Sequence, residues 1–196
     1  MMHKKIIFPI FIVIAIIQLS IPVKSIYNQE QILSEGKEFK FQTAPVDPND
    51  PFRGKYIALR FKENEIRVNS YEDWEKGQEV FVVITENKEG FANPLRALLK
   101  EPTNEKHYLT AKIQNVNTHK DQYNHIISKE ITIQYPFNRF YMEESKAKAA
   151  EDLYRKSTSD SKTSTYALVN IKNGKATLKD VMINDISIKD AVNDSK

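Results

Sequence analysis

The feature that most constrains this chain is an uncharged, apolar stretch near its N-terminus, Ile6 to Val23. It is rich in Ile, Val, Phe and Leu and follows two lysines, Lys4 and Lys5. As an α-helix, about 18 residues extend roughly 27 Å, which is close to the thickness of the hydrocarbon core of a bilayer. Positive charge on the N-terminal side favours keeping the N-terminus in the cytoplasm. We therefore expect residues 1–25 to anchor the chain in a membrane, with the rest of the chain outside the cytoplasm.

A cleaved signal peptide is the alternative interpretation of this segment, because Val23-Lys24-Ser25 offers a small-residue cleavage site after Ser25. The apolar stretch is longer than the 7 to 15 residues typical of a signal peptide, which favours the anchor. A buried core helix fits less well, since the stretch is apolar on all sides rather than amphipathic. Pro9 and Pro22 lie near its ends, where a missing backbone N–H costs least.

The charge balance of the remaining chain argues against nucleic-acid binding. Removing Lys4, Lys5 and Lys24 from the 29 basic residues leaves 26, equal to the 26 acidic residues of the whole chain, none of which lies in residues 1–25. Binding to phosphate backbones needs a clustered positive field, whereas here the two signs alternate along the sequence. The chain contains no cysteine, so disulfides, thiolate chemistry and thiolate metal sites are excluded.

The chain of 196 residues has the length of one anchor and one domain. We expect a juxtamembrane helix or linker at residues 26–37, a β-rich domain at 38–190 and a tail at 191–196. Alternation of apolar and polar residues predicts strands at 38–42, 54–61, 79–85, 108–115, 126–135, 166–172, 175–181 and 183–188. The prolines and Asp or Asn residues of 45–51 predict an irregular turn. Asn173-Gly174 joins two of the strands and suits a type I′ hairpin turn.

Two helices are expected in the domain. Residues 143–156 place Ala147, Ala150, Leu153 and Tyr154 at helical spacing, whereas a short helix from Asn93-Pro94 through residues 95–99 rests on capping residues alone. Residues 157–164 are expected to form a polar loop. The predicted fold class is α+β and mainly β: an N-terminal transmembrane helix followed by an antiparallel sheet or open barrel with one docked helix.

Residues 47–61 carry a motif that resembles the GDYxxLxY family of membrane-anchored bacterial proteins. The Gly, first Tyr and Leu of the family motif fall on Gly54, Tyr56 and Leu59, whereas its Asp and last Tyr are replaced by Lys55 and Phe61. The Asp-Pro and Arg that precede the motif in the family are also present. The candidate site residues from this block are Asp47, Asp50 and Arg53, together with the motif positions Gly54, Tyr56 and Leu59.

A second block strengthens the resemblance. Residues 139–144 read Arg-Phe-Tyr-Met-Glu-Glu, similar to an Arg-aromatic-aromatic segment of the family followed by Glu, and Glu151 matches a later Glu. Ser145 and Ala147 stand where the family tends to have Gly, and residues 176–188 are also similar. The resemblance implies a bacterial membrane location and genes that often lie beside those of polytopic membrane proteins. It supplies no reaction.

Two constellations of charged residues are candidates for chemistry. Asp47, Asn49 and Asp50 resemble the start of a calcium loop, but Pro51 occupies a ligand position, and structural hydrogen bonds within the turn are the alternative. Arg53 and Arg139 can each pair with a carboxylate, and Glu144 and Glu151 lie two turns apart on one helix face. These four residues could serve a hydrolase. The favoured alternative is an ion-pair cluster that fastens the helix to the sheet, because no nucleophile or oxyanion motif accompanies them.

Other residue types give weaker signals. His107, His119 and His125 lack the spacing of a zinc site, and no metal or cofactor is expected. Ser157, Thr158 and Ser159 lack the surrounding motif of a serine hydrolase. Tyr56, Tyr135 and Tyr141 are expected to be core or rim aromatics.

No catalytic motif is recognisable in the sequence, so we expect a membrane-anchored binding or assembly module rather than an enzyme. Its expected partners are the lipid bilayer, through residues 6–23, and an integral membrane protein. The alternatives are an extracytoplasmic hydrolase using Glu144 or Glu151 with Arg53 or Arg139, and a ligand-sensing domain of the cell envelope. A sensing domain would need an apolar pocket inside the sheet.

Overall fold

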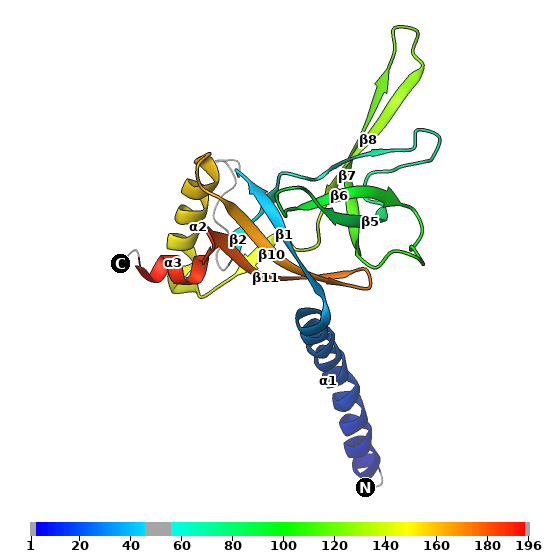
Figure 1. Cartoon of the computed structure of the whole chain (residues 1–196). Helices are drawn as coiled ribbons and strands as arrows, with labels where there is room; N and C mark the ends of the chain where they lie inside the picture. The colour runs from blue at the N-terminus through cyan, green and yellow to red at the C-terminus, as the bar shows by residue number, and fades with distance from the viewer. Residues whose placement is uncertain (1–2, 46–55, 195–196) are drawn as a thin grey trace.

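The structure is a computed structural model that describes residues 3–45 and 56–194. Figure 1 shows a β-rich domain carried at one end of a long helix. The helices are α1 (His3–Glu35), α2 (Glu144–Ser159) and α3 (Ile188–Asp194). The strands are β1 (Lys37–Ala44), β2 (Tyr56–Ala58), β3 (Arg60–Phe61), β4 (Glu65–Val68), β5 (Glu79–Glu86), β6 (Ala92–Leu98), β7 (Tyr108–Lys120), β8 (Ile126–Gln134), β9 (Arg139–Tyr141), β10 (Thr165–Lys172), β11 (Lys175–Ile183) and β12 (Ile186–Ser187).

Helix α1 runs without interruption through the apolar stretch and the polar residues that follow it. Its 33 residues give a length of about 50 Å. A helix or a linker was expected at residues 26–37, and the structure shows helix as far as Glu35. Pro9 and Pro22 lie inside α1 rather than at its ends. The segment Phe8–Glu35 is long and apolar enough to span a membrane, and the domain covers none of its most apolar window.

The domain contains two five-stranded antiparallel sheets and a two-stranded ribbon. The first sheet, called here the anchor sheet, has the order β12-β11-β10-β1-β3 and follows directly from α1. The second, the distal sheet, has the order β4-β8-β7-β5-β6, and contact between its edge strands β4 and β6 makes it a nearly closed barrel. The ribbon pairs β2 with β9. The predicted mainly β, antiparallel fold is therefore confirmed.

One continuous apolar core joins the two sheets. At its centre are four aromatic side chains, Phe41, Phe61, Tyr135 and Phe137, whose ring centroids lie 4.9 to 5.9 Å apart. The sheets also meet at the β10–β11 turn, where the Thr110 N–H donates to the Gly174 carbonyl at 2.8 Å. The core therefore couples the anchor sheet to the distal sheet.

The predicted hairpin and the longer predicted helix are both confirmed. Asn173 and Gly174 have φ values of 48° and 76°, the left-handed backbone that a type I′ turn requires. Helix α2 buries Ala147, Ala150 and Tyr154 against the domain. It continues to Ser159, so the loop expected at residues 157–164 starts too early and is confined to residues 160–164. The hydroxyl groups of residues 157–159 donate to carbonyls three or four residues earlier, so these polar groups are satisfied inside the helix.

Three further predictions need correction. The short helix expected at residues 95–99 belongs to strand β6, where Pro94 is tolerated because β6 is an edge strand with a bulge in its pairing to β5. The single strand expected at 54–61 is divided at Leu59, because β2 pairs with β9 whereas β3 pairs with β1. Of the strand expected at 183–188, only the short strand β12 forms, between the end of β11 at Ile183 and the start of α3 at Ile188. Helix α3, which buries Ile188 and Val192, was not expected.

Candidate functional site

The two sequence blocks that carry the family resemblance lie side by side in the fold. Strand β2 from the first block pairs antiparallel with β9 from the second, with Tyr56 opposite Tyr141 and Ala58 opposite Arg139. The blocks are separated by 77 residues in sequence. The ribbon they form is therefore the first candidate for a shared functional surface.

One face of this ribbon carries a cation above aromatic rings. The Arg139 guanidinium lies 5.0 Å from the centre of the Tyr56 ring, and the rings of Tyr56 and Tyr141 are 5.6 Å apart. Tyr141 is 62 % exposed, so this face is open to solvent. Stacking on Tyr56 restrains Arg139 while leaving its N–H groups available for an anionic partner.

Leu59 and Phe61 have a structural role instead. Leu59 is buried, and its N–H donates to the Asn138 carbonyl at 2.9 Å, which ties the first block to the chain just before β9. Phe61 packs within the central aromatic cluster, where the family motif has Tyr. The hydroxyl group in that cluster belongs to Tyr135, which donates to the Glu63 carbonyl at 2.6 Å.

The two candidate glutamates lie on α2. Glu144 is exposed in the first turn and Glu151 is half-buried two turns later. Both interact with other parts of the molecule, but neither lines the groove described next, to which Arg139 contributes. The remaining motif positions, Asp47, Asp50, Arg53 and Gly54, lie outside the described residues, as does the calcium-loop hypothesis.

A broad groove opens where α1 meets the domain. Its volume is about 970 Å³. Four residues of α1, Ser25, Asn28, Gln29 and Ile32, form one wall. The opposite walls come from residues 134–141, which include β9, from the start of β11 at residues 174–179, from residues 110–112 of β7, and from Lys189 of α3.

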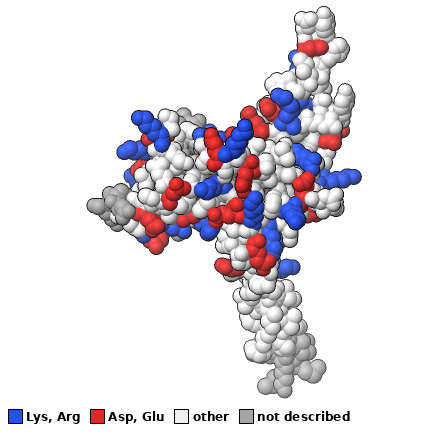
Figure 2. Space-filling view, viewed as in Figure 1, with Lys and Arg blue, Asp and Glu red and all other residues white. Residues whose placement is uncertain are grey.

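The groove is strongly basic, in contrast to the neutral domain. Among the described residues, its lining contains five cations and one carboxylate, Glu79. The five cations are Lys112, Arg139, Lys175, Lys179 and Lys189. Figure 2 shows charged side chains of both signs over the domain, whereas the surface of α1 away from it is almost free of them.

Two of these cations face carboxylates. Lys179 forms an ion pair with Glu38 at 2.7 Å, and Lys112 lies opposite Glu79 in the pairing of β5 with β7. Within residues 3–45 and 56–194, the other three cations form no ion pair. Arg139 stacks on Tyr56, Lys189 lies 5.2 Å from the centre of the Phe140 ring, and Lys175 is exposed beside the β10–β11 turn.

Sequence reasoning singled out Arg139 but missed the groove. The lysines that line it are spread singly from residue 112 to residue 189, so the chain shows no basic run. The spacing of Ser25, Asn28, Gln29 and Ile32 was the available signal. These residues follow i, i+3, i+4, i+7 and therefore share one helix face.

The buried tyrosines remain neutral at physiological pH. Burial raises the pKa of Tyr154 to about 12 and also raises the pKa of Tyr135. Burial, with a hydrogen bond to Asp185, raises the pKa of Tyr166 to about 12. Their phenols are therefore poor nucleophiles: all three side chains pack, and the Tyr135 and Tyr166 hydroxyls also donate hydrogen bonds, to the Glu63 carbonyl and the Asp185 carboxylate.

The histidines and acidic residues form no metal centre in the part of the chain that the structure describes. His125 contacts Asp121 at 3.1 Å within the β7–β8 turn, where the Asp121 carboxylate also accepts backbone N–H groups. His107 packs edge-on against Phe39 with ring centroids 5.7 Å apart. Burial, together with Lys37 and Lys106, lowers the pKa of His107 below 6.5.

These features define a class: a mainly β domain carried on an apolar helix, with a basic groove at the junction of the two. The chain belongs to the family described as GDYXXLXY protein, whose pattern matches residues 18–181. The match includes the groove face of α1, both motif blocks and β11, but not Lys189. No curated protein and no solved structure matches the chain.

Proposed function

We propose that this chain is a membrane-anchored binding or assembly module that associates with an integral membrane protein. In this proposal α1 crosses the cytoplasmic membrane of a bacterium once, with its N-terminus inside and the β domain outside. The apolar, uncovered surface of α1 supports this placement, as do the lysines that precede the apolar stretch.

The observation that carries the proposal is the rigid connection between α1 and the domain. Only Gly36 separates the end of α1 from the start of β1. Ile32 is buried at the junction, and the Gly36 N–H donates to the Ile32 carbonyl at 2.9 Å. A Cβ atom at residue 36 would lie 2.4 Å from that carbonyl oxygen, so this backbone geometry accommodates only glycine.

Two side chains from β10 strengthen the connection. The buried Asn170 amide donates to the carbonyls of Leu33 and Gly36 at 3.1 and 3.3 Å. Lys172 forms an ion pair with Glu35 at 2.5 Å. A domain fixed in this way has one height and orientation above the bilayer, which suits docking to a membrane partner better than reaching a distant substrate.

This architecture gives less support to the hydrolase alternative. That alternative needs Glu144 or Glu151 beside Arg53 or Arg139. Neither glutamate lines the groove that Arg139 faces, and Arg53 lies outside the described residues.

Photo-crosslinking of the full chain in native membranes tests the proposal. A photoreactive residue at Leu19, which is 65 % exposed on α1, should crosslink to an integral membrane protein that also copurifies in mild detergent. The matched control places the same residue at Tyr123, which is 71 % exposed in the β7–β8 turn. Recovery of the chain alone and monomeric in several detergents, with no protein crosslink from Leu19, would overturn the proposal.

A further inference from the structure

We propose that the basic groove binds the phosphate-bearing headgroup of an anionic phospholipid. The inference rests on the membrane placement of α1 in the proposed function, and adds a ligand class to the groove. It follows from the depth of the groove, its charge and the apolar surface that continues from it.

The groove lies at the height of the lipid headgroups if α1 spans the bilayer. Its α1 wall begins at Ser25, two residues beyond the apolar stretch, and ends at Ile32. At 1.5 Å per residue, this wall extends from about 3 to about 14 Å beyond Val23. The headgroup layer is roughly 5 to 8 Å thick on each side of the hydrocarbon core, so the lower part of the groove lies within it.

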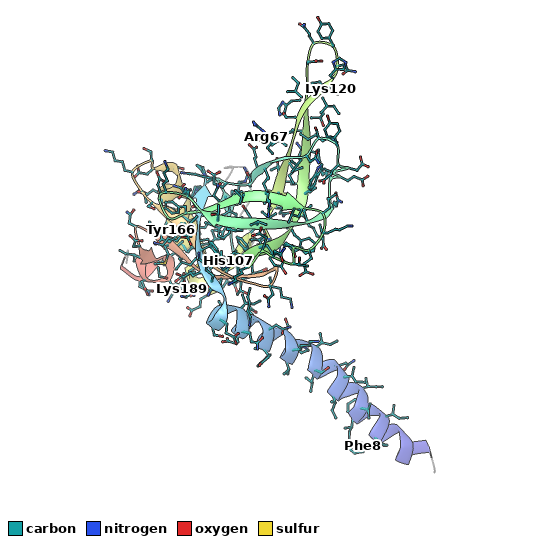
Figure 3. The ribbon with its side chains drawn as sticks, turned by 45° about the vertical axis from the view of Figure 1, so that its right-hand side comes forward. Phe8, Arg67, His107, Lys120, Tyr166 and Lys189 are labelled. Carbon is teal, nitrogen blue, oxygen red and sulfur yellow. The ribbon has the colours of Figure 1, made fainter. Side chains whose placement is uncertain are left out.

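The charge of the groove fits a phosphate diester. Arg139, Lys175 and Lys189 form no ion pair in the described parts of the chain, and they come from three different elements that converge on one groove. Arg and Lys are the side chains that bind phosphate oxygens, Arg through its planar fork and Lys as a point charge. Figure 3 shows Lys189 on the side of the domain from which α1 leaves.

The remaining lining fits the rest of a phospholipid. Ser25, Asn28 and Gln29 present hydrogen-bonding groups on one face of α1, next to the position of the glycerol and ester groups. Below them, on the same helix face, the exposed apolar side chains of Ile14 and Ile21 offer a surface along which acyl chains can lie. A free phosphate ester would use the cations and the polar residues of α1 but gain nothing from the apolar surface below them, which favours the lipid as the source of the phosphate.

Native mass spectrometry of the full chain in non-ionic detergent tests this inference. The probe is an equimolar mixture of phosphatidylglycerol and phosphatidylcholine with matched acyl chains. The wild type should retain phosphatidylglycerol preferentially. The triple variant R139Q/K175Q/K189Q should lose roughly tenfold or more of that preference, because each basic residue near a lipid surface contributes to anionic lipid binding.

A matched control separates the groove from overall charge. The variant K76Q/K88Q/K120Q also removes three exposed lysines, none of which lines the groove or forms an ion pair within the described residues. Lys120 lies far from α1, near the tip of the β7–β8 hairpin in Figure 3. This control should keep the lipid preference of the wild type, and both triple variants should keep its melting temperature.

Three results would overturn the inference. They are equal retention of the two lipids by the wild type, equal losses in the two triple variants, and full displacement of phosphatidylglycerol by millimolar glycerol 3-phosphate, which would assign the groove to a free phosphate ester. Failure of the proposed function is distinguishable from these, because it would be seen as a missing crosslink from Leu19 whether or not lipid is retained.

Discussion

Strand β10 of the anchor sheet and strand β8 of the distal sheet differ in how many of their residues are buried. In β10, at the centre of the anchor sheet, six of the eight residues are buried. In β8 of the distal sheet only Ile131 and Ile133 are buried, and Ile126 and Ile127 at its far end are exposed. The hairpin of β7 and β8 accordingly projects from the domain (Figure 1). Packing is therefore dense in the core that joins the two sheets, whereas the far end of the β7–β8 hairpin is paired without being packed.

The largest effect should appear on replacing isoleucine along β8. Ile131→Ala should lower the free energy of unfolding by about 3 to 4 kcal/mol, because the side chain is fully buried. Ile127→Ala, four residues away on the same strand and 66 % exposed, should change it by less than about 0.5 kcal/mol. Denaturant titration measures both. Similar losses would mean that the far end of the hairpin is packed.

The next effect concerns two glycines, one in each region. Gly36→Ala should cost about 3 kcal/mol, because the added Cβ meets the Ile32 carbonyl oxygen at 2.4 Å and backbone must move. Gly90→Ala, in the β5–β6 turn, meets nothing within 4 Å and should cost only about 1 to 2 kcal/mol from its positive φ. Thermal unfolding monitored by circular dichroism compares the two. A larger loss at residue 90 would contradict the tight junction.

A smaller difference is expected between two asparagines. Asn170→Ala should destabilise the domain by about 1 to 2 kcal/mol, since it removes donors to the Leu33 and Gly36 carbonyls at the end of α1. Asn115→Ala on β7 removes only a bond to the neighbouring Asn117 side chain and should cost less than about 0.5 kcal/mol. Equal melting temperatures for the two variants would show that Asn170 does not fasten the helix.

The smallest effect should be a pH dependence from His107. Its pKa is lowered in the folded state, so the unfolded state binds the proton more readily. The neutral His107 therefore makes its full contribution to the free energy of unfolding above pH 6.5. This contribution is lost as the pH falls below 6.5 towards the folded-state pKa. Between pH 7 and 5.5, the melting temperature of His107→Gln should fall less than that of the wild type. His119→Gln, on the exposed part of β7, should leave the wild-type slope unchanged, and equal slopes in all three proteins would refute the assignment.

The sequence predicted the helices and turns better than it predicted which strands pair. Asn173-Gly174 and the helical spacing of Ala147, Ala150 and Tyr154 are local signals, and the structure confirms both. The division of the first motif block at Leu59 was not predictable in this way, because each half pairs with a strand distant in sequence. The helix-capping signal of Asn93-Pro94 was outweighed by strand pairing with β5, which lies only a few residues earlier.

The candidate site was predictable only in part. Arg139 and the two motif blocks were identified from the resemblance, and the structure brings Tyr56, Tyr141 and Arg139 together. The groove depends on Lys175 and Lys189 as well, which come from separate elements, β11 and α3. A cluster assembled by tertiary structure leaves no run of charge in the sequence, so net charge gave no sign of it.

Single-cysteine accessibility tests the central claim, that α1 lies in the bilayer and carries the domain on the far side, most directly. The chain has no cysteine, so one introduced thiol is the only target. In intact cells a membrane-impermeant maleimide should label a Tyr123→Cys variant fully and an Ile17→Cys variant hardly at all, with both proteins in the membrane fraction. Labelling at both positions, or recovery of either protein in the soluble fraction, would contradict the account.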